Sequence, residues 1–124
     1  MKIYESAENY LETILMLKSE NDTVRSIDIV NELEYSKASV SVAMKNLREN
    51  GYIVMDDEGS IKLTAKGQEI AEIIYERHRL LSDWLVMLGV NEKTATADAC
   101  RMEHVISKET FEAIKKHVNY KSSR

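Results

Sequence analysis

The sequence contains no proline, only four glycines and a single cysteine in 124 residues. Proline interrupts helices and glycine marks sharp turns, so their scarcity favours long helices joined by short turns. The single Cys100 excludes an intramolecular disulfide, and no charged leader followed by an apolar stretch opens the chain, so we expect a cytoplasmic protein. No apolar run approaches the ~20 residues of a membrane span, so we expect no membrane association.

The sequence also has fewer basic than acidic residues. Lys and Arg number 17 against 21 Asp and Glu, which gives a formal net charge of -4. This balance excludes a basic patch over the whole protein, so any nucleic-acid surface must be local. With 44% hydrophobic positions, the chain suits one compact unit or two small modules and not a large multidomain enzyme.

The first half of the chain predicts three helices. Residues 4–18 repeat apolar side chains at helical spacing, and the polar stretch 19–23 ends that helix. A short second helix begins near Ser26, its expected N-cap, and a third runs from the N-cap Ser36 to the stop signal Asn50-Gly51. A short helix, a tight turn and a second helix form a helix-turn-helix arrangement.

The only strand signal follows directly. Residues 52–55 and 61–64 are short β-prone runs, and the turn between them contains Gly59, which predicts a hairpin. A hairpin placed directly after a helix-turn-helix is the order of a winged helix. The sequence therefore predicts a mostly α protein with a winged helix-turn-helix domain over residues 1–70.

Helices alone are predicted for the rest of the chain. The expected spans are 65–88, ended by Gly89, then 91–105, then 107–118 with Ser107 as N-cap, and a frayed polar tail over 119–124. They form an all-helical domain over residues 71–124. The apolar residues of 70–88 exceed what one short bundle buries, so we expect a homodimer through this domain.

One side of the third helix carries groups that suit a DNA groove. This side lies opposite the apolar face formed by Val40, Ala43 and Leu47. Serine hydroxyls bond base edges or phosphates, small apolar groups touch thymine methyls, and cationic groups neutralise phosphates. The candidate contact residues are Lys37, Ala38, Ser39, Ser41, Val42, Lys45 and Arg48. An ordinary solvated helix face fits the same residues equally well.

The charge around this helix opposes DNA binding. Residues 1–64 hold seven basic side chains against twelve acidic ones, and Asp56, Asp57 and Glu58 form an acidic hairpin tip. Such a tip should repel phosphate. We therefore expect a wing held away from the DNA backbone, or weak and strongly salt-sensitive binding.

The most specific chemical signal is the run Cys100-Arg101-Met102-Glu103-His104. On a helix, Cys100, Glu103 and His104 stand at i, i+3 and i+4 and offer a thiolate, a carboxylate and an imidazole on one face. Each alone is more often a small buried hydrophobe or a surface group. Together they favour a divalent metal site, because metal ligands occur as clusters.

With these motifs, the chain resembles the metal-dependent transcription regulators related to the diphtheria toxin repressor. That family includes iron-responsive members and the shorter manganese transport regulators, which lack a third domain. The resemblance extends from about Glu8 to His117 and rests on five ordered blocks. They are Glu8–Glu12, Ser36–Arg48, Leu63–Gly67, Arg77–Leu81 and Asp98–Val105. The resemblance implies a repressor of double-stranded operator DNA, dimerising through its last three helices, with a metal site between them and the first helix.

The resemblance also implies a ligand set. Its members are Asn9, Glu12, His78, Cys100, Glu103 and His104. The last three match the primary site of the iron-responsive branch, whereas Glu12 and His78 match ligands of the manganese branch. Asn9 departs from both branches, which have Met and Asp there; an amide oxygen still ligates, but it brings no charge.

The resemblance also bears on which metal is bound. The ancillary site of the iron branch is not carried over, since Ser82 and Thr96 stand where it needs Glu and His. A binuclear site of the manganese type stays open, although Cys100 replaces one of its bridging carboxylates. Thiolate with imidazole leans toward Fe²⁺, Co²⁺, Ni²⁺ or Zn²⁺, whereas Mn²⁺ prefers oxygen-rich sites. We expect Fe²⁺ as the physiological metal, with Mn²⁺ close behind.

Two other functions fit these residues. A metal-independent winged-helix regulator, in which Cys100 and His104 are structural, is supported by the neutral Asn9. A hydrolytic metalloenzyme is disfavoured, because so small a chain implies no substrate-sized cleft. In addition, no general base with a supporting partner can be named in the sequence. We expect neither enzymatic activity nor a small-molecule substrate.

Overall fold

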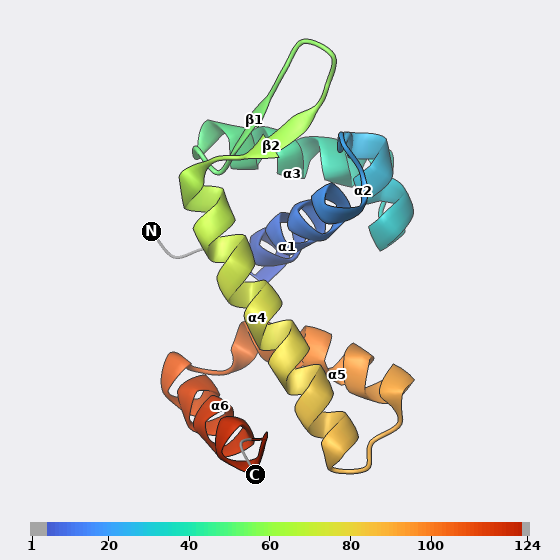
Figure 1. Ribbon diagram of the computed structural model, residues 1–124. Coiled ribbons are helices and arrows are strands. Elements are labelled where there is room, and N and C mark those ends of the chain that lie inside the picture. The colour runs from blue at the N-terminus through green and yellow to red at the C-terminus, as the bar shows by residue number, and fades with distance from the viewer. Residues whose placement is uncertain (1–4, 123–124) are drawn as a thin grey trace. The chain divides into compact units, whose positions relative to one another are not determined.

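The computed structural model describes the backbone of residues 5–122 and the side chains of residues 5–118 (Figure 1). Its elements in chain order are α1 (Glu5–Glu20), α2 (Ser26–Leu33), α3 (Lys37–Glu49), β1 (Ile53–Met55), β2 (Ile61–Leu63), α4 (Ala65–Met87), α5 (Glu92–Val105) and α6 (Lys108–Ser122). The chain divides into two compact units within α4: the first ends at Ile73 and the second begins at Ile74. The expected mostly α fold, a winged helix followed by helices, is confirmed.

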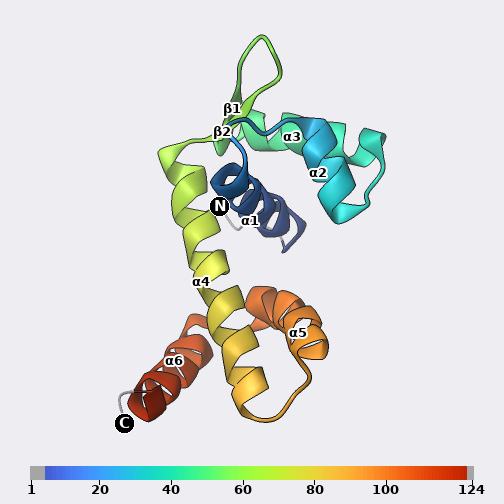
Figure 2. The ribbon, with the colours of Figure 1, turned by 45° about the vertical axis from the view of Figure 1, so that its right-hand side comes forward.

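The first unit packs three helices and a hairpin around one apolar core. In it, α1 packs against α2, α3 and β2, while β1 packs against α3 (Figure 2). The fully buried side chains at its centre include Leu11, Ile14, Val24, Ile29, Val40, Ile53 and Ile61. Val40, Met44 and Leu47 of α3 enter this core, so the opposite face of that helix is left to solvent.

The hairpin predicted from the sequence is confirmed. Strands β1 and β2 are antiparallel, with Ile53 opposite Leu63. In the turn, the Asp56 carboxylate accepts hydrogen bonds from the backbone N–H groups of Glu58 and Ser60, each 2.9 Å long. Gly59 adopts a φ of 83°, a left-handed conformation that favours glycine.

The start of α4 is held against Gly51 and Tyr52, the two residues just before β1. The Thr64 hydroxyl donates to the Gly51 carbonyl oxygen over 2.6 Å and accepts from the Gly67 N–H over 3.2 Å. A Cβ atom at Gly67 would overlap the backbone carbonyl of Tyr52. The Lys66 ammonium lies 4.4 Å from the centre of the Tyr52 ring. Glycine at 67 therefore allows the helix to approach the backbone of the wing.

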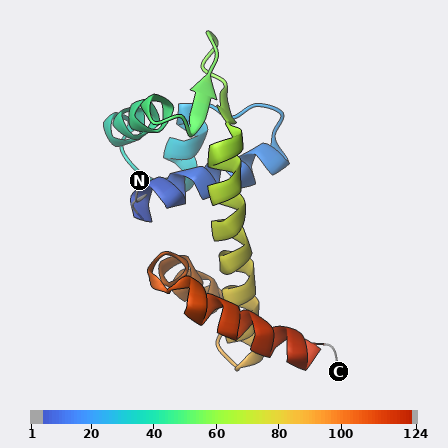
Figure 3. The ribbon, with the colours of Figure 1, turned by 90° about the vertical axis from the view of Figure 1, so that its left-hand side faces the viewer.

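The second unit consists of the remaining part of α4 with α5 and α6. Figure 3 shows α6 crossing this part of α4. Glu76 of α4 forms a 2.9 Å ion pair with Lys115 of α6, and this hydrogen bond raises the pKa of Lys115 above its ordinary value. The Arg77 guanidinium carbon lies 5.3 Å from the ring centre of the buried Phe111. Among the described residues, no helix is long and apolar enough to cross a membrane.

Local signals placed most helix ends correctly. Ser36 and Ser107 are N-caps, each accepting a backbone N–H from the residue three positions on. Gly89 follows α4 with a φ of 103°. Its N–H donates to the Val86 carbonyl oxygen, and the Val90 N–H donates to the Leu85 carbonyl oxygen, each over 3.0 Å. This is a Schellman motif, which closes the helix as the glycine predicts.

Two expected ends are wrong. Ser26 is the first helical residue of α2 and not its cap; Arg25 holds the cap position, and its N–H donates to the Asp28 carboxylate over 2.9 Å. The tail from Asn119 is not frayed up to Ser122, because α6 continues to that residue. Tyr4 and residues 123–124 lie outside the described part of the chain.

Candidate metal centre and nucleic-acid interface

A buried carboxylate lies between two imidazole rings in the second unit. Glu103 of α5 is 0% exposed, and its Oε2 lies 2.9 Å from Nδ1 of His78 on α4. Its Oε1 lies 3.3 Å from Nε2 of His104, a side chain that is 2% exposed. An ionised carboxylate loses much hydration energy on burial unless it is paired, and the two rings supply partners. The structure thus brings three of the predicted ligands together.

Contacts at both ends of α5 cap the helix that carries Glu103. Asn91 caps the start of the helix by accepting the Lys93 N–H over 2.9 Å. At the other end, Nη1 of Arg77 donates to the carbonyl oxygens of Glu103, over 3.1 Å, and Ile106, over 3.2 Å. The role of Arg77 was missed from the sequence, since only the packing of α4 on α5 creates it.

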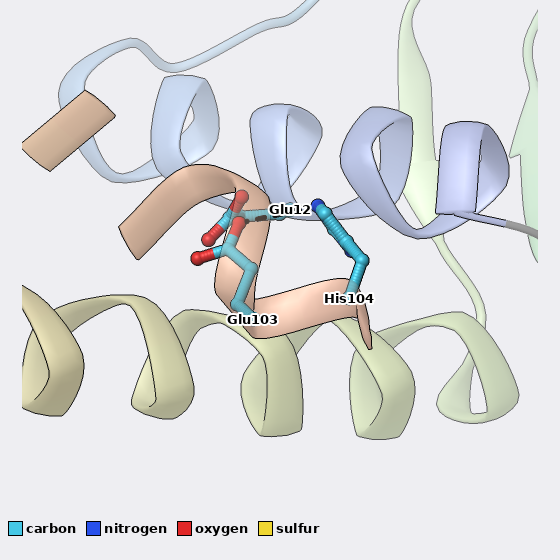
Figure 4. Close-up of side chains that lie close together, drawn as sticks. All are labelled: Glu12, Glu103 and His104. Carbon is cyan, nitrogen blue, oxygen red and sulfur yellow. Dashed lines mark ion pairs between the residues drawn. The ribbon is translucent and has the colours of Figure 1, made fainter. Parts of the chain in front are cut away.

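The other predicted ligands are placed as follows. Cys100 is half-buried and lies one turn before Glu103 on α5. Asn9 and Glu12 belong to α1 in the first unit, where Asn9 is half-buried and Glu12 is 4% exposed. Figure 4 shows Glu12 on α1, and Glu103 with His104 on α5. That Asn9, Glu12 and Cys100 bind the same ion stays a prediction.

The donor set of the cluster fits a divalent transition metal. Imidazole nitrogen with carboxylate oxygen is accepted by Fe²⁺, Co²⁺, Zn²⁺ and Mn²⁺, and a neighbouring thiolate shifts the preference away from Mn²⁺. Burial of Glu103 and His104 also gives a low-dielectric site, in which the attraction between a carboxylate and a cation is strong. The residues present therefore suit a metal ion.

A second candidate surface is the solvent face of α3. Val40, Met44 and Leu47 are buried, and every predicted DNA-contact residue on this helix is exposed, with Val42 at 61%. The N-cap Ser36 also donates its hydroxyl to that of Ser39 over 2.9 Å. The predicted contact residues thus share the solvent side of α3, and their binding to DNA stays a prediction.

Two further contacts lie in the segments next to α3 in the chain, one at the tip of the wing and one in the turn before α3. Arg25 donates from Nε to the Glu58 carbonyl oxygen over 3.2 Å, which places a guanidinium beside the acidic tip of the wing. Tyr35, in the turn before α3, meets Tyr10 of α1 edge to face with 5.8 Å between ring centres. Burial, and to a lesser extent Tyr35, raises the pKa of Tyr10. The turn that precedes α3 is therefore in contact with α1.

Together these features define a class of protein: a winged-helix unit with an exposed basic helix face, followed by a helical unit with a buried carboxylate and histidine cluster. Comparisons of sequence give the particular family. Residues 2–60 match the family model "iron dependent repressor, N-terminal DNA binding domain". Residues 64–123 match "iron dependent repressor, metal binding and dimerisation domain".

Individual relatives agree with these matches. The chain is 35% identical over 113 residues to an uncharacterized HTH-type transcriptional regulator of Methanocaldococcus jannaschii, covering 90% of each protein. It is also 35% identical over 115 residues to the HTH-type transcriptional regulator MntR of Shouchella clausii, covering 93% of this chain and 80% of that one. The chain therefore belongs to the diphtheria toxin repressor family of metal-dependent transcriptional repressors. Its relatives are regulators and not enzymes, as expected from the sequence.

Solved structures share the fold. The manganese regulator SloR has a TM-score of 0.82 at 27% identity, over 97% of this chain and 55% of that one. A manganese-dependent transcriptional repressor solved with manganese has a TM-score of 0.83 at 27% identity, over 92% and 53%. This chain thus spans about half the length of these two regulators.

Proposed function

We propose that this chain is a homodimeric repressor that binds double-stranded operator DNA when a divalent transition metal is bound, and that it acts in the cytoplasm. Residues 1–70 bind DNA, and residues 71–124 bind metal and dimerise. The observation that carries this proposal is the buried Glu103 between His78 and His104. It lies in the half of the chain that matches a metal-binding and dimerisation domain.

The ligands come from both units of the chain. His78, Glu103 and His104 form the core of the set, and Cys100 adds a thiolate from the same helix face. Asn9 and Glu12 of α1 add oxygen donors from the first unit. Ligands drawn from two units restrict the motion of one unit relative to the other. The metal supplies the positive charge that these carboxylates require when they converge.

This restriction couples metal binding to DNA binding. In a two-fold dimer, two recognition helices must reach major-groove faces about one helical turn apart at the same time. Freely moving winged units meet that spacing only part of the time, so fixing them raises the affinity for DNA. Ala38, Ser39, Ser41 and Val42 contact bases, while Lys37, Lys45 and Arg48 contact phosphates.

Fe²⁺ is the favoured metal. A thiolate from Cys100 with two imidazoles suits Fe²⁺ better than Mn²⁺, which prefers a harder set of oxygen ligands. Mn²⁺ is the second candidate, because two solved relatives are described as manganese regulators. Co²⁺, Ni²⁺ and Zn²⁺ are expected to substitute in vitro.

A gel-shift experiment tests the switch. The demetallated protein and the Fe²⁺-loaded protein, kept anaerobic, are titrated against the duplex that the loaded protein selects from a random pool. We expect binding about 5- to 150-fold tighter with metal, the usual range of coupling between two sites. Equal affinity with and without metal contradicts switching. Counting the ions bound per chain distinguishes a mononuclear site from a binuclear one.

A metal-independent regulator is the second candidate, favoured by two observations. Asn9 brings no charge to the proposed site, and Glu103 already has two imidazole partners in the structure. In that case the DNA affinity of the wild type does not depend on metal, and the DNA affinity of Glu103→Gln should not depend on metal either. In a metal switch, Glu103→Gln abolishes the response to metal while Glu92→Gln, an exposed change on the same helix, preserves it.

A further inference from the structure

Two consecutive residues of α4 hold Glu103 at two different points. Arg77 binds its backbone, since Nη1 donates to the Glu103 carbonyl oxygen over 3.1 Å. His78 binds its side chain, with Nδ1 2.9 Å from Oε2. Attachment at two points fixes both the position and the rotation of Glu103 relative to His78.

The backbone contact also completes the end of α5. The last carbonyl groups of a helix have no partner within it, and a cation near them is favoured by the helix dipole. Ile106 N–H satisfies the Met102 carbonyl, while Arg77 satisfies those of Glu103 and Ile106. A single guanidinium therefore caps the helix turn that presents Glu103 and His104.

Arg77 is itself held in place by α6. Its guanidinium carbon lies 5.3 Å from the ring centre of Phe111, a side chain that is 3% exposed. Arg79, two residues on, also lies near a ring, that of Tyr75 at 5.9 Å, but it is exposed. Within the described residues, the contacts measured for Arg79 include none to α5. The two arginines thus form a natural pair for comparison.

We propose that Arg77 is the positioning residue of the metal centre: its guanidinium sets the distance between His78 and Glu103 without touching the ion. This inference rests on the proposed metal-binding function. Ligands at fixed spacing bind a cation without having to be ordered first, so loss of the capping contacts lowers affinity. Partners of metal ligands typically contribute about 10- to 100-fold to metal affinity.

The test compares full-length Arg77→Met, Arg77→Lys and the control Arg79→Met with the wild type. Co²⁺ affinity is measured by titration well below the melting temperature of each demetallated protein, where the folded fraction is essentially complete. We expect Arg77→Met to weaken Co²⁺ binding about 10- to 100-fold, and Arg79→Met to change it less than about 3-fold. Arg77→Lys keeps the charge and N–H donors but loses the planar guanidinium, so its Co²⁺ affinity should fall between those of wild type and Arg77→Met.

A measurement on the demetallated protein distinguishes a positioning role of Arg77 from a role in stability alone. In the demetallated wild type, ¹⁵N NMR of the His78 ring should show Nδ1 hydrogen-bonded to the carboxylate, and Arg77→Met should lose this signature while Arg79→Met keeps it. A loss of thermal stability with unchanged Co²⁺ affinity and an unchanged His78 ring overturns the proposal. If Arg77→Met does not fold, the same two measurements on Arg77→Lys decide, and wild-type values overturn it.

Failure of the proposed function is recognised separately. If the wild type binds no Co²⁺, Fe²⁺ or Mn²⁺, the metal function is wrong, and the His78 ring signature alone decides whether Arg77 positions Glu103. If the wild type binds metal and Arg77→Met binds it equally well, the metal function stands and the role of Arg77 is refuted.

Discussion

Glu103 is the residue on which the metal proposal depends most. A carboxylate with no exposed surface stays ionised only where nearby groups replace its lost hydration. The two Glu103 oxygens lie 2.9 Å from Nδ1 of His78 on α4 and 3.3 Å from Nε2 of His104 on α5, and both rings are also ordinary metal ligands. The same geometry is compatible with an ion-pair network and with a metal site. Substitutions at neighbouring positions are therefore needed to distinguish these two interpretations.

Substitutions of Cys100 should affect the affinities for the candidate metals differently. We expect Cys100→Ala to weaken Fe²⁺ and Co²⁺ binding about tenfold or more, because a ligand of the softer type is lost. Cys100→Glu should retain Mn²⁺ better than Fe²⁺ or Co²⁺, since it restores an oxygen donor. Competition titrations on the demetallated variants measure both effects. Binding by the wild type should also release a proton, because the thiol must ionise to act as a ligand.

The spectrum of the Co²⁺ complex checks this assignment. A thiolate ligand gives an intense near-ultraviolet charge-transfer band, and oxygen or nitrogen ligands do not. A stoichiometric Co²⁺ complex without the band would remove Cys100 from the site, and with it the preference for Fe²⁺. In that case Cys100→Ala should leave the metal affinity intact, whereas Cys100→Glu would place a charge at a half-buried position one turn from Glu103 and lower the stability of the fold.

Gly67 offers a test of the fold that carries these sites. Helix propensity alone predicts that Gly67→Ala stabilises the protein by up to about 1 kcal/mol. The added Cβ would overlap the Tyr52 carbonyl, which is backbone and cannot rotate away. We therefore expect the opposite sign, a loss of about 1–3 kcal/mol in the free energy of unfolding in urea. The exposed Glu69→Ala in the same helix serves as control, and a stabilised Gly67→Ala would refute the close approach.

At the residue scale, sequence alone predicted the contacts that depend on helical spacing. Glu103 and His104 were expected on one helix face with Cys100, and the structure places the first two side by side. The Arg77 contact with Glu103 joins residues 26 positions apart. No spacing rule within one helix reveals such a contact, because it depends on how two helices pack.

Helix ends show the same limit at the scale of elements. Asn50-Gly51 and Gly89 were correct stop signals, because a left-handed glycine ends a helix by local geometry. The start of α2 was misplaced by one residue, since Asp28 bonds the amide of Arg25 and makes Ser26 helical. The end of α6 was set too early, because polar residues after Val118 were interpreted as a tail although no proline or glycine interrupts them.

The exposed face of α3 predicts two classes of substitution. Replacing Ser41 or Val42 by Ala should alter the preferred base sequence, since base contacts carry specificity, at about 1–3 kcal/mol for each good contact. Replacing Lys45 or Arg48 by Ala should weaken binding to all sequences and reduce the salt slope by about 1 for each phosphate contact. Fluorescence titrations with specific and scrambled duplexes at several salt concentrations measure both.

The outcome at Lys45 is decisive for this assignment. If Lys45→Ala relaxed base preference and left the salt slope unchanged, the side chain would contact bases, and our division of α3 into two classes would be wrong. Glu49→Gln, an exposed acidic position at the end of the same helix, serves as control for general charge effects.

At the scale of the whole molecule, the second unit leaves apolar surface uncovered at the end of α4. Val86, Met87 and Leu88 follow one another in the chain and are 44%, 59% and 63% exposed. Contiguous apolar groups on a small unit mark interaction surfaces. The match of residues 64–123 to a dimerisation domain favours a second copy of this chain as the partner.

We expect the wild type to sediment as a dimer at micromolar concentration, with or without metal. Leu88→Glu should weaken dimerisation about tenfold or more, because a two-fold interface contains each substitution twice and about 1.4 kcal/mol corresponds to a factor of ten. Val54→Glu is the matched control, since Val54 is 52% exposed on β1 of the other unit and should leave the dimer intact. Circular dichroism establishes that both variants are folded. A monomeric wild type would contradict the proposed dimer. If Val54→Glu dissociated a dimer that Leu88→Glu preserved, dimerisation would depend on the winged unit and not on the end of α4.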